Sequence, residues 1–195
     1  MGVAEILLAG SQGKLEMGSE PVPLWKDGGF VTDRFLPIAE ETPLAFDIPA
    51  TVSLARWRNE RSALLNHEAP LALLIRPGED WEEIGSDLSR FATISVSIAK
   101  FSDGRAFSIG RLIRERWAFG GELRAIGIFI LDQMPLLCRV GFDAFEIRDP
   151  ILRRQLESGA WPEVTAYLQP IDAARETPAG TRPWARRRAK EVGRT

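Results

Sequence analysis

A single stretch decides the fold class of this chain: LALLIRPGEDWEEIGSDLSRFATISVSI, residues 71–98. It opens with a continuous apolar run, Leu71 to Ile75, and closes with a β-branched run, Thr93 to Ile98. Between the two runs, Asp80 precedes a segment with two glutamates in its first turn, where a helix dipole favours negative charge. The stretch therefore predicts a strand, a helix from Trp81 to about Arg90 and a second strand, which is typical of a crossover between parallel strands.

The same alternation continues on both sides of this stretch. The further elements that we expect are a strand at 51–54, an apolar-striped segment at 56–66, a helix from Ile109 to Trp117 with Ser108 as its N-cap, a strand at 123–126, an apolar helix with Asp132 as its N-cap and Pro135 in its first turn, and a strand at 144–147. The sequence thus predicts an α/β fold with a mostly parallel sheet of about five strands and crossover helices.

The flanking regions have weaker patterns. Residues 24–31 resemble a small N-terminal hairpin around Asp27-Gly28-Gly29, and residues 32–49 hold three prolines without a clear period, which favours a loop. We expect a disordered leader at 1–20, a single α/β domain at 21–172 and a flexible basic tail at 173–195.

Composition excludes several classes of protein. The 195 residues are 45% hydrophobic and 27% charged with a net charge of −2, which gives no reason to expect nucleic acid or an anionic membrane as a partner. Cys138 and His67 are the single cysteine and histidine, so one chain builds neither a disulfide framework nor a Cys- or His-rich metal site. With no motif for a cofactor and no apolar run of about 20 residues, we expect a cytoplasmic protein without metal or cofactor.

The densest polar cluster runs from Lys100 to Ser108, between a predicted strand and a predicted helix. Backbone N–H groups at a helix start attract anions, so Lys100, Arg105 and Ser108, with Arg124 from the next strand, are the candidate anion-binding residues. Asp103 and Asp132 are the candidate catalytic groups of a small enzyme. The alternative is that Asp103-Gly104 forms a turn and Arg105 pairs with a nearby acid.

Arg124 lies inside a predicted central strand, where an unpaired charge is costly. We expect its side chain to be at least half buried and paired with a carboxylate such as Asp132 or Glu146. If Arg105 and Arg124 converge on one concave site, oxyanion binding or catalysis is favoured, whereas separate pairs favour an interaction role.

The remaining reactive and apolar residues have simpler interpretations. His67 lies at a helix end, away from any nucleophile, and Cys138 is expected to be buried and inert in an apolar helix. Aromatic residues at helix and strand spacing predict core rather than a stacking platform. The apolar segment 128–137 requires a cover, which is either residues 151–172 or another chain, including a second copy in a homodimer.

Seven runs form one pattern of residues and spacing: LWKDGGF at 24–30, FSDGRAFS at 101–108, RLIRER at 111–116, GELRA at 121–125, DQ at 132–133, RVGFDAF at 139–145 and YLQP at 167–170. Together they resemble a bacterial family, the domain of unknown function nine hundred and thirty-four. The position after Gly127 is usually polar in that family, commonly aspartate, and is Ile128 here. Members are commonly encoded beside assimilatory sulfite reductase. The resemblance implies an accessory protein of sulfate and sulfite reduction that binds sulfite reductase, another protein of the pathway or a small oxyanion. The alternatives are a small enzyme for an anionic substrate and a pure interaction protein or scaffold.

Overall fold

The computed structural model describes residues 22–38, 40, 42–45 and 47–162, together with two strands near the C-terminus. These are β9 (Glu176–Ala179) and β10 (Arg182–Arg188), which pair with each other in antiparallel fashion. They fall inside the segment for which a flexible basic tail is expected. The expected leader at 1–20 and the rest of that tail lie outside the described residues.

The main sheet has eight strands in the order β2-β1-β8-β7-β6-β5-β4-β3. The strands are β1 (Leu24–Lys26), β2 (Gly29–Val31), β3 (Leu36–Pro37), β4 (Ala50–Ser53), β5 (Leu71–Ile75), β6 (Thr93–Ile98), β7 (Glu122–Gly127) and β8 (Ala144–Glu146). From β3 to β8 every neighbouring pair is parallel and follows the order of the chain. The β1–β2 hairpin joins the other edge because β1 pairs antiparallel with β8.

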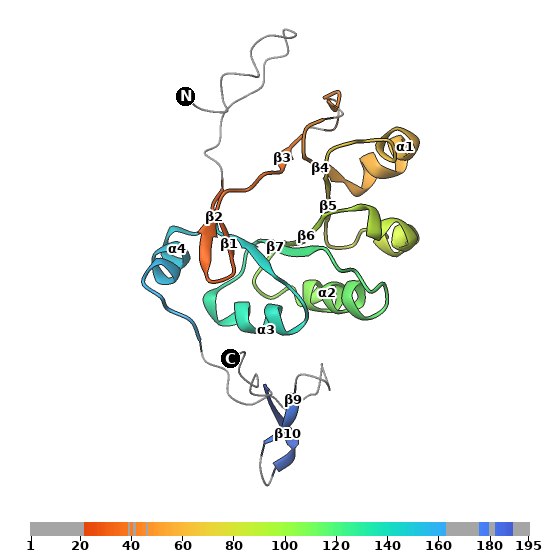
Figure 1. Cartoon of the computed structure of the whole chain (residues 1–195). Helices are drawn as coiled ribbons and strands as arrows, with labels where there is room; N and C mark the ends of the chain where they lie inside the picture. Colours follow the sequence, from red (N-terminus) through yellow and green to blue (C-terminus); the bar gives the residue numbers. More distant parts are fainter. Residues whose placement is uncertain are drawn as a thin grey trace, which may run out of the picture.

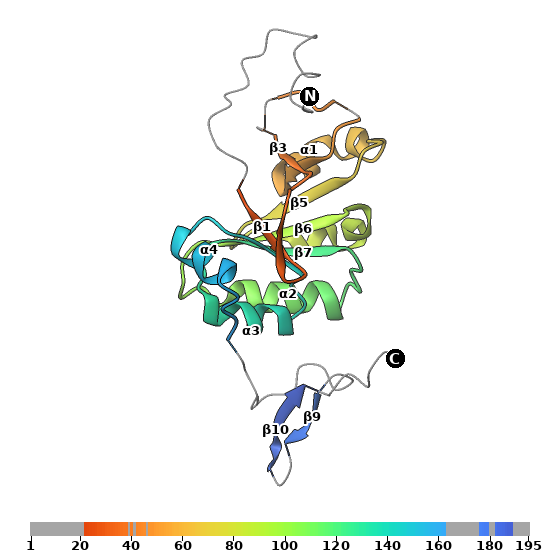
Figure 2. The ribbon, with the colours of Figure 1, turned by 60° about the vertical axis from the view of Figure 1, so that its left-hand side comes forward.

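Helices follow the outside of this curled sheet (Figures 1 and 2). They are α1 (Leu54–Leu64), the 3-10 helix η2 (Trp81–Arg90), α2 (Arg105–Glu115), the 3-10 turn η3 (Leu131–Gln133), α3 (Met134–Arg139) and α4 (Pro150–Glu157). Because the strands are added in one direction, crossovers of one hand place the successive helices on one face.

The α/β class, the parallel central strands and the hairpin agree with the sequence analysis, but the number of strands does not. Eight strands replace about five because the hairpin extends the sheet and because β3 forms within the expected loop at 32–49. β3 has two residues, one of them Pro37, which lacks an N–H group for a ladder and is tolerated at an edge. So short an element has no detectable period.

Three helix starts also differ from expectation. Helix α2 begins at Arg105, so Ser108 lies within the helix instead of capping it, because Asp103 already accepts a hydrogen bond from the Arg105 N–H group. Asp80 occupies the cap position of η2 without a side-chain hydrogen bond. Gln133, not Asp132, precedes α3, although a proline does lie in its first turn as expected.

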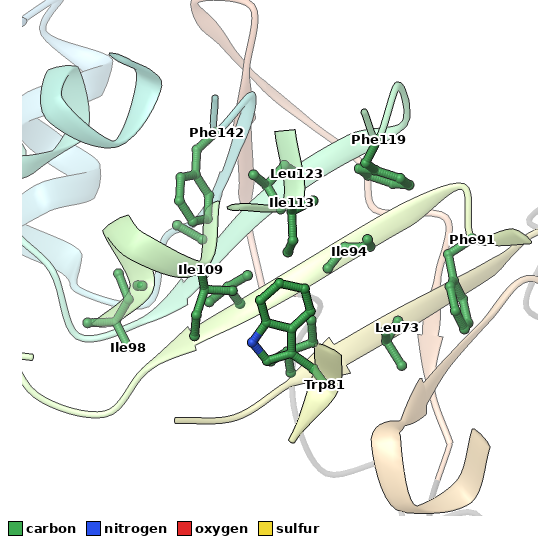
Figure 3. Packing of buried hydrophobic residues seen from close by; sticks show 14 of the residues in the cluster. Leu73, Trp81, Phe91, Ile94, Ile98, Ile109, Ile113, Phe119, Leu123 and Phe142 are labelled. Carbon is green, nitrogen blue, oxygen red and sulfur yellow. The ribbon is translucent and has the colours of Figure 1, made fainter. Parts of the chain in front are cut away.

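The core fills the layer between the sheet and the helices (Figure 3). Leu73, Ile94 and Leu123 project from three adjacent strands and are fully buried. Trp81 of η2 and Ile113 of α2 are buried in the same cluster. Alternation along the strands places Thr93, Ser95 and Arg124 on the opposite face of the sheet, and all three are buried there as well.

Candidate functional site

Two loops meet at the carboxyl edge of the parallel strands. The amide of the Gln133 side chain donates to the Phe101 carbonyl (3.2 Å), and its oxygen accepts from the Ile130 N–H group (3.2 Å). The Ile128 N–H group donates to the Ile98 carbonyl at the end of β6 (2.9 Å). The loop after β6 and the loop after β7 therefore form one bonded surface, at the edge where ligands of open α/β sheets usually bind.

Two of the three charged side chains of this loop, Asp103 and Arg105, are bound to each other. Arg105 donates from Nε and Nη2 to the two carboxylate oxygens of Asp103, at 2.9 and 2.7 Å. These side-chain bonds, followed by the Arg105 backbone N–H group, lower the pKa of Asp103 to about 2. Lys100 and Ser108 are exposed, and Ser108 is not at the helix start. The alternative interpretation of the cluster, a turn with an internal ion pair, is the one that the structure shows.

Arg124 lies on the face of the sheet opposite the hydrophobic core, and its side chain is only 4% exposed. Its guanidinium contacts Asp33 at 2.5 Å and Glu122 at 2.8 Å, and Glu122 also accepts from Lys26 at 2.8 Å. Burial lowers the pKa of Arg124, but the hydrogen bonds to Asp33 and then to Glu122 outweigh it, so the pKa is raised. Burial and pairing are confirmed, whereas Asp132 and Glu146 were the wrong partners. Asp33 could not be identified as the partner from sequence, because it lies in an irregular segment whose residues show no periodicity.

Arg105 and Arg124 consequently do not form one site. Arg105 is 57% exposed at the start of α2, and Arg124 is enclosed on the face of the sheet opposite the core. Asp132 is exposed on η3, and within the described residues no hydrogen bond or ion pair joins it to Asp103. The six candidate residues thus do not form one site: Arg124 is separate from the others, and of the three loop charges Asp103 and Arg105 are bound to each other.

The two loops at the carboxyl edge expose apolar side chains. Phe101 (53% exposed), Ile128 (57%) and Ile130 (42%) project from the two bonded loops, and we call these three residues the carboxyl-edge patch. Sequence reasoning identified the segment from Ile128 onwards but missed Phe101. The available signal was a large apolar residue inside an otherwise polar loop.

The segment 128–137 is covered on its inner side by its own domain. Phe129, Met134 and Leu137 are buried, and the ring of Phe129 lies 5.8 Å from that of Phe145 on β8. Helical spacing leaves Leu136 outside at 38% exposure. Leu152 and Leu156 of α4 belong to the same core cluster as the buried residues of this segment, so the first part of the 151–172 segment shares this core, and a second chain is not needed for the inner side.

Cys138 and His67 are the single cysteine and histidine considered from the sequence. Cys138 is exposed, which corrects the expectation of a buried thiol, because its neighbour Leu137 takes the inward position of the short helix α3. Both ring nitrogens of His67 lie near backbone carbonyls, those of Ala69 (2.9 Å) and Ala45 (3.0 Å), as in a structural histidine. The described residues contain no group of three or more metal-ligating side chains.

Comparison with known proteins identifies the family. The family described as "Bacterial protein of unknown function (DUF934)" matches residues 72–177, more than half of the chain. The chain belongs to this family. The match begins in β5, ends in β9 and includes all of the carboxyl-edge patch. No curated protein and no solved structure matches the chain. Within the part of the chain that the structure describes, no helix has the length and apolar character needed to cross a membrane.

Proposed function

We propose that this protein is an accessory protein of assimilatory sulfite reduction and acts by binding a partner protein through the carboxyl-edge patch. The pathway rests on the resemblance to a family encoded beside sulfite reductase. The mode of action rests on one observation, the exposure of Phe101, Ile128 and Ile130 on two loops that are hydrogen-bonded to each other through Gln133. Clustered exposed apolar side chains mark interaction sites, whereas scattered ones do not.

The end of β7 fixes the position of Ile128 in the patch. Gly127 ends β7 with a φ of 102°, and a Cβ atom there would lie 2.4 Å from the Ile98 carbonyl oxygen. This close approach supports the hydrogen bond from Ile128 to Ile98 and fixes the direction in which Ile128 projects. A preorganised apolar surface loses little conformational entropy on binding.

Binding of a small oxyanion has less support. Arg105 is neutralised by Asp103, and Arg124 by Asp33 and Glu122. An enzyme that uses Lys100, Asp103 and Arg105 meets the same difficulty, because the acid and the guanidinium are bound to each other. The family's usual polar residue after Gly127 is replaced by Ile128, which favours an apolar contact in this member.

The test is co-purification of tagged protein from its native organism, combined with growth on sulfate as the sole sulfur source. We compare wild type, the double variant Phe101→Ser/Ile128→Ser and the control Leu36→Ser, which alters a similarly exposed residue (43%) on β3 at the far edge of the sheet. We expect sulfite reductase or another protein of the pathway to be retained by wild type and control. The double variant should lose the partner and support growth poorly.

A folded double variant that keeps the partner and supports normal growth contradicts docking through this patch. Growth on sulfate that does not depend on the protein contradicts the pathway. Light scattering at micromolar concentration identifies the remaining occupant, a second copy of the chain. If the wild-type protein is a dimer and the double variant is a monomer, the patch is an interface between two copies of this chain and not a site for a different protein.

A further inference from the structure

A cavity lies away from the carboxyl-edge patch, between the turn of the β1–β2 hairpin, α3 and the end of α4. Its volume is about 670 Å³, within the range of sites for small molecules. The three elements that border it come together at one side of the molecule (Figures 1 and 2). Its described lining combines aromatic and aliphatic side chains with three carboxylates.

Aromatic and aliphatic side chains line much of this cavity. Trp25 and Phe145 are direct neighbours across the β1–β8 ladder and project to the same face. Leu156 lines the cavity from α4, and Trp161 is 46% exposed. A ligand that covers the indole of Trp161 would therefore remove apolar surface from water.

The polar lining is acidic. Asp27, Asp143 and Glu157 line the cavity, and its described lining includes no lysine, arginine or histidine. Two of these carboxylates already have partners: Asp143 accepts from Arg114 and from the Leu123 N–H group, and Glu157 accepts from Arg153. Within the described residues the Asp27 side chain has neither a hydrogen bond nor an ion pair; its carboxylate acts on the neighbouring Lys26 only at longer range, so its oxygen atoms are open to a ligand.

Asp27 is held in place by the hairpin. Asp27 and Gly28 have φ values of 52° and 79°, the left-handed conformation of both central residues in the tight turn that suits a two-residue hairpin. The strands on either side pair with full register, from Leu24–Val31 to Lys26–Gly29. The free carboxylate therefore stands on a rigid turn beside the aromatic lining of the cavity.

We propose that this cavity binds a small molecule with an ammonium group on an apolar body. A carboxylate attracts the ammonium group, and aromatic faces attract a cation through their quadrupoles. The apolar body would lie against Trp25 and Trp161, because Phe145 and Leu156, which also line the cavity, are each only 2% exposed. Asp143 and Glu157 are neutralised by Arg114 and Arg153, so the discrimination by sign of charge depends on the carboxylate of Asp27, which would repel an anionic ligand.

The test uses three probes of similar shape: 2-phenylethylamine, 2-phenylethanol and 3-phenylpropionate. Binding is followed through the NMR signals of the indole N–H groups, which are assigned with Trp25→Phe and Trp161→Phe. We expect the amine to shift the signals of these two tryptophans and to bind about fivefold more tightly than the alcohol, with the acid weaker still. The advantage of the amine should shrink as salt is added.

Two variants and one control locate the charge. Asp27→Asn keeps a residue that tolerates the left-handed turn and should lower the affinity for the amine about fivefold while leaving the affinity for the alcohol unchanged. Glu157→Gln should have a smaller effect, and Glu68→Gln, which alters an exposed carboxylate outside this cavity, should have none. Equal affinity for amine and alcohol, an unchanged affinity in Asp27→Asn, or shifts confined to the other tryptophans would each overturn the proposal.

Discussion

Replacement of Arg124 by leucine tests the charge cluster that joins the hairpin, the 32–35 segment and β7. The variant removes a guanidinium that is 4% exposed and leaves Asp33 and Glu122, whose side chains are 22% and 15% exposed. Removing one partner of a fully buried pair costs about 3–5 kcal/mol, because the other charge stays uncompensated. Glu122 keeps Lys26 at 2.8 Å, and water reaches Asp33, so we expect about 3 kcal/mol.

Thermal unfolding followed by circular dichroism measures this loss. For a domain of this size 1 kcal/mol corresponds to about 3 °C, so the melting temperature of Arg124→Leu should fall by about 9 °C. Arg111→Leu is the matched control, because Arg111 pairs with Glu115 where both side chains are 48% exposed; its change should stay below about 0.5 kcal/mol.

A second variant separates charge from packing. Asp33→Asn added to Arg124→Leu removes an orphaned carboxylate and should recover part of the lost stability, whereas lost packing alone would not be recovered. An Arg124→Leu protein that melts within about 1 °C of wild type would refute the reasoning. So would a double variant that is less stable than the single one.

Three shorter predictions concern other parts of the molecule. The pKa of Asp87 is lowered chiefly by the hydrogen bonds from Arg61, and that of Glu122 is lowered because Lys26 and Arg124 outweigh its burial. Both groups therefore stabilise the fold above their unfolded pKa of about 4, and the free energy of unfolding should decline from about pH 5 to pH 3, less steeply in Asp87→Asn. Gly121→Ala should cost about 1–3 kcal/mol in urea unfolding, because the new Cβ would lie 2.7 Å from the Ala92 carbonyl oxygen, while Gly120→Ala, with nothing within 4 Å, should leave stability within about 0.5 kcal/mol. Cys138 is exposed and should react with a maleimide in the folded protein; a thiol that reacts only after urea is added would contradict its exposure.

The central part of the fold follows from local patterns. The strands at 71–75, 93–98 and 123–126 and the crossover at 81–90 were predictable because each carries its own period and its own boundary residues. The structure places β5, β6, η2 and β7 within one or two residues of these ranges. Long buried strands leave a strong signal because nearly every residue must be apolar or β-branched.

The edges and the surface could not be predicted in this way. β3 owes its place to pairing with β4, and two residues are too few to show a period. The partner of Arg124 is Asp33, from a loop far away in the chain, so its identity depends on tertiary contacts alone. The carboxyl-edge patch depends on which apolar residues stay outside, and Phe129 and Ile130 differ in burial although both are apolar neighbours.

The order of the sheet also has a consequence for the way in which the chain folds. Strands β3 to β8 are neighbours in the sheet in the order of the chain, so each strand pairs with the one that precedes it and these contacts have a short sequence separation. The β1–β2 hairpin is the exception, because Leu24 stands opposite Glu146 and the first strand of the sheet must wait for the last. During synthesis the hairpin leaves the ribosome before β8, so it docks only after β8 has formed, with Trp25 and Phe30 exposed in the interval. A chaperone that recognises apolar segments would accordingly find its target in the β1–β2 hairpin, and release would coincide with the emergence of β8.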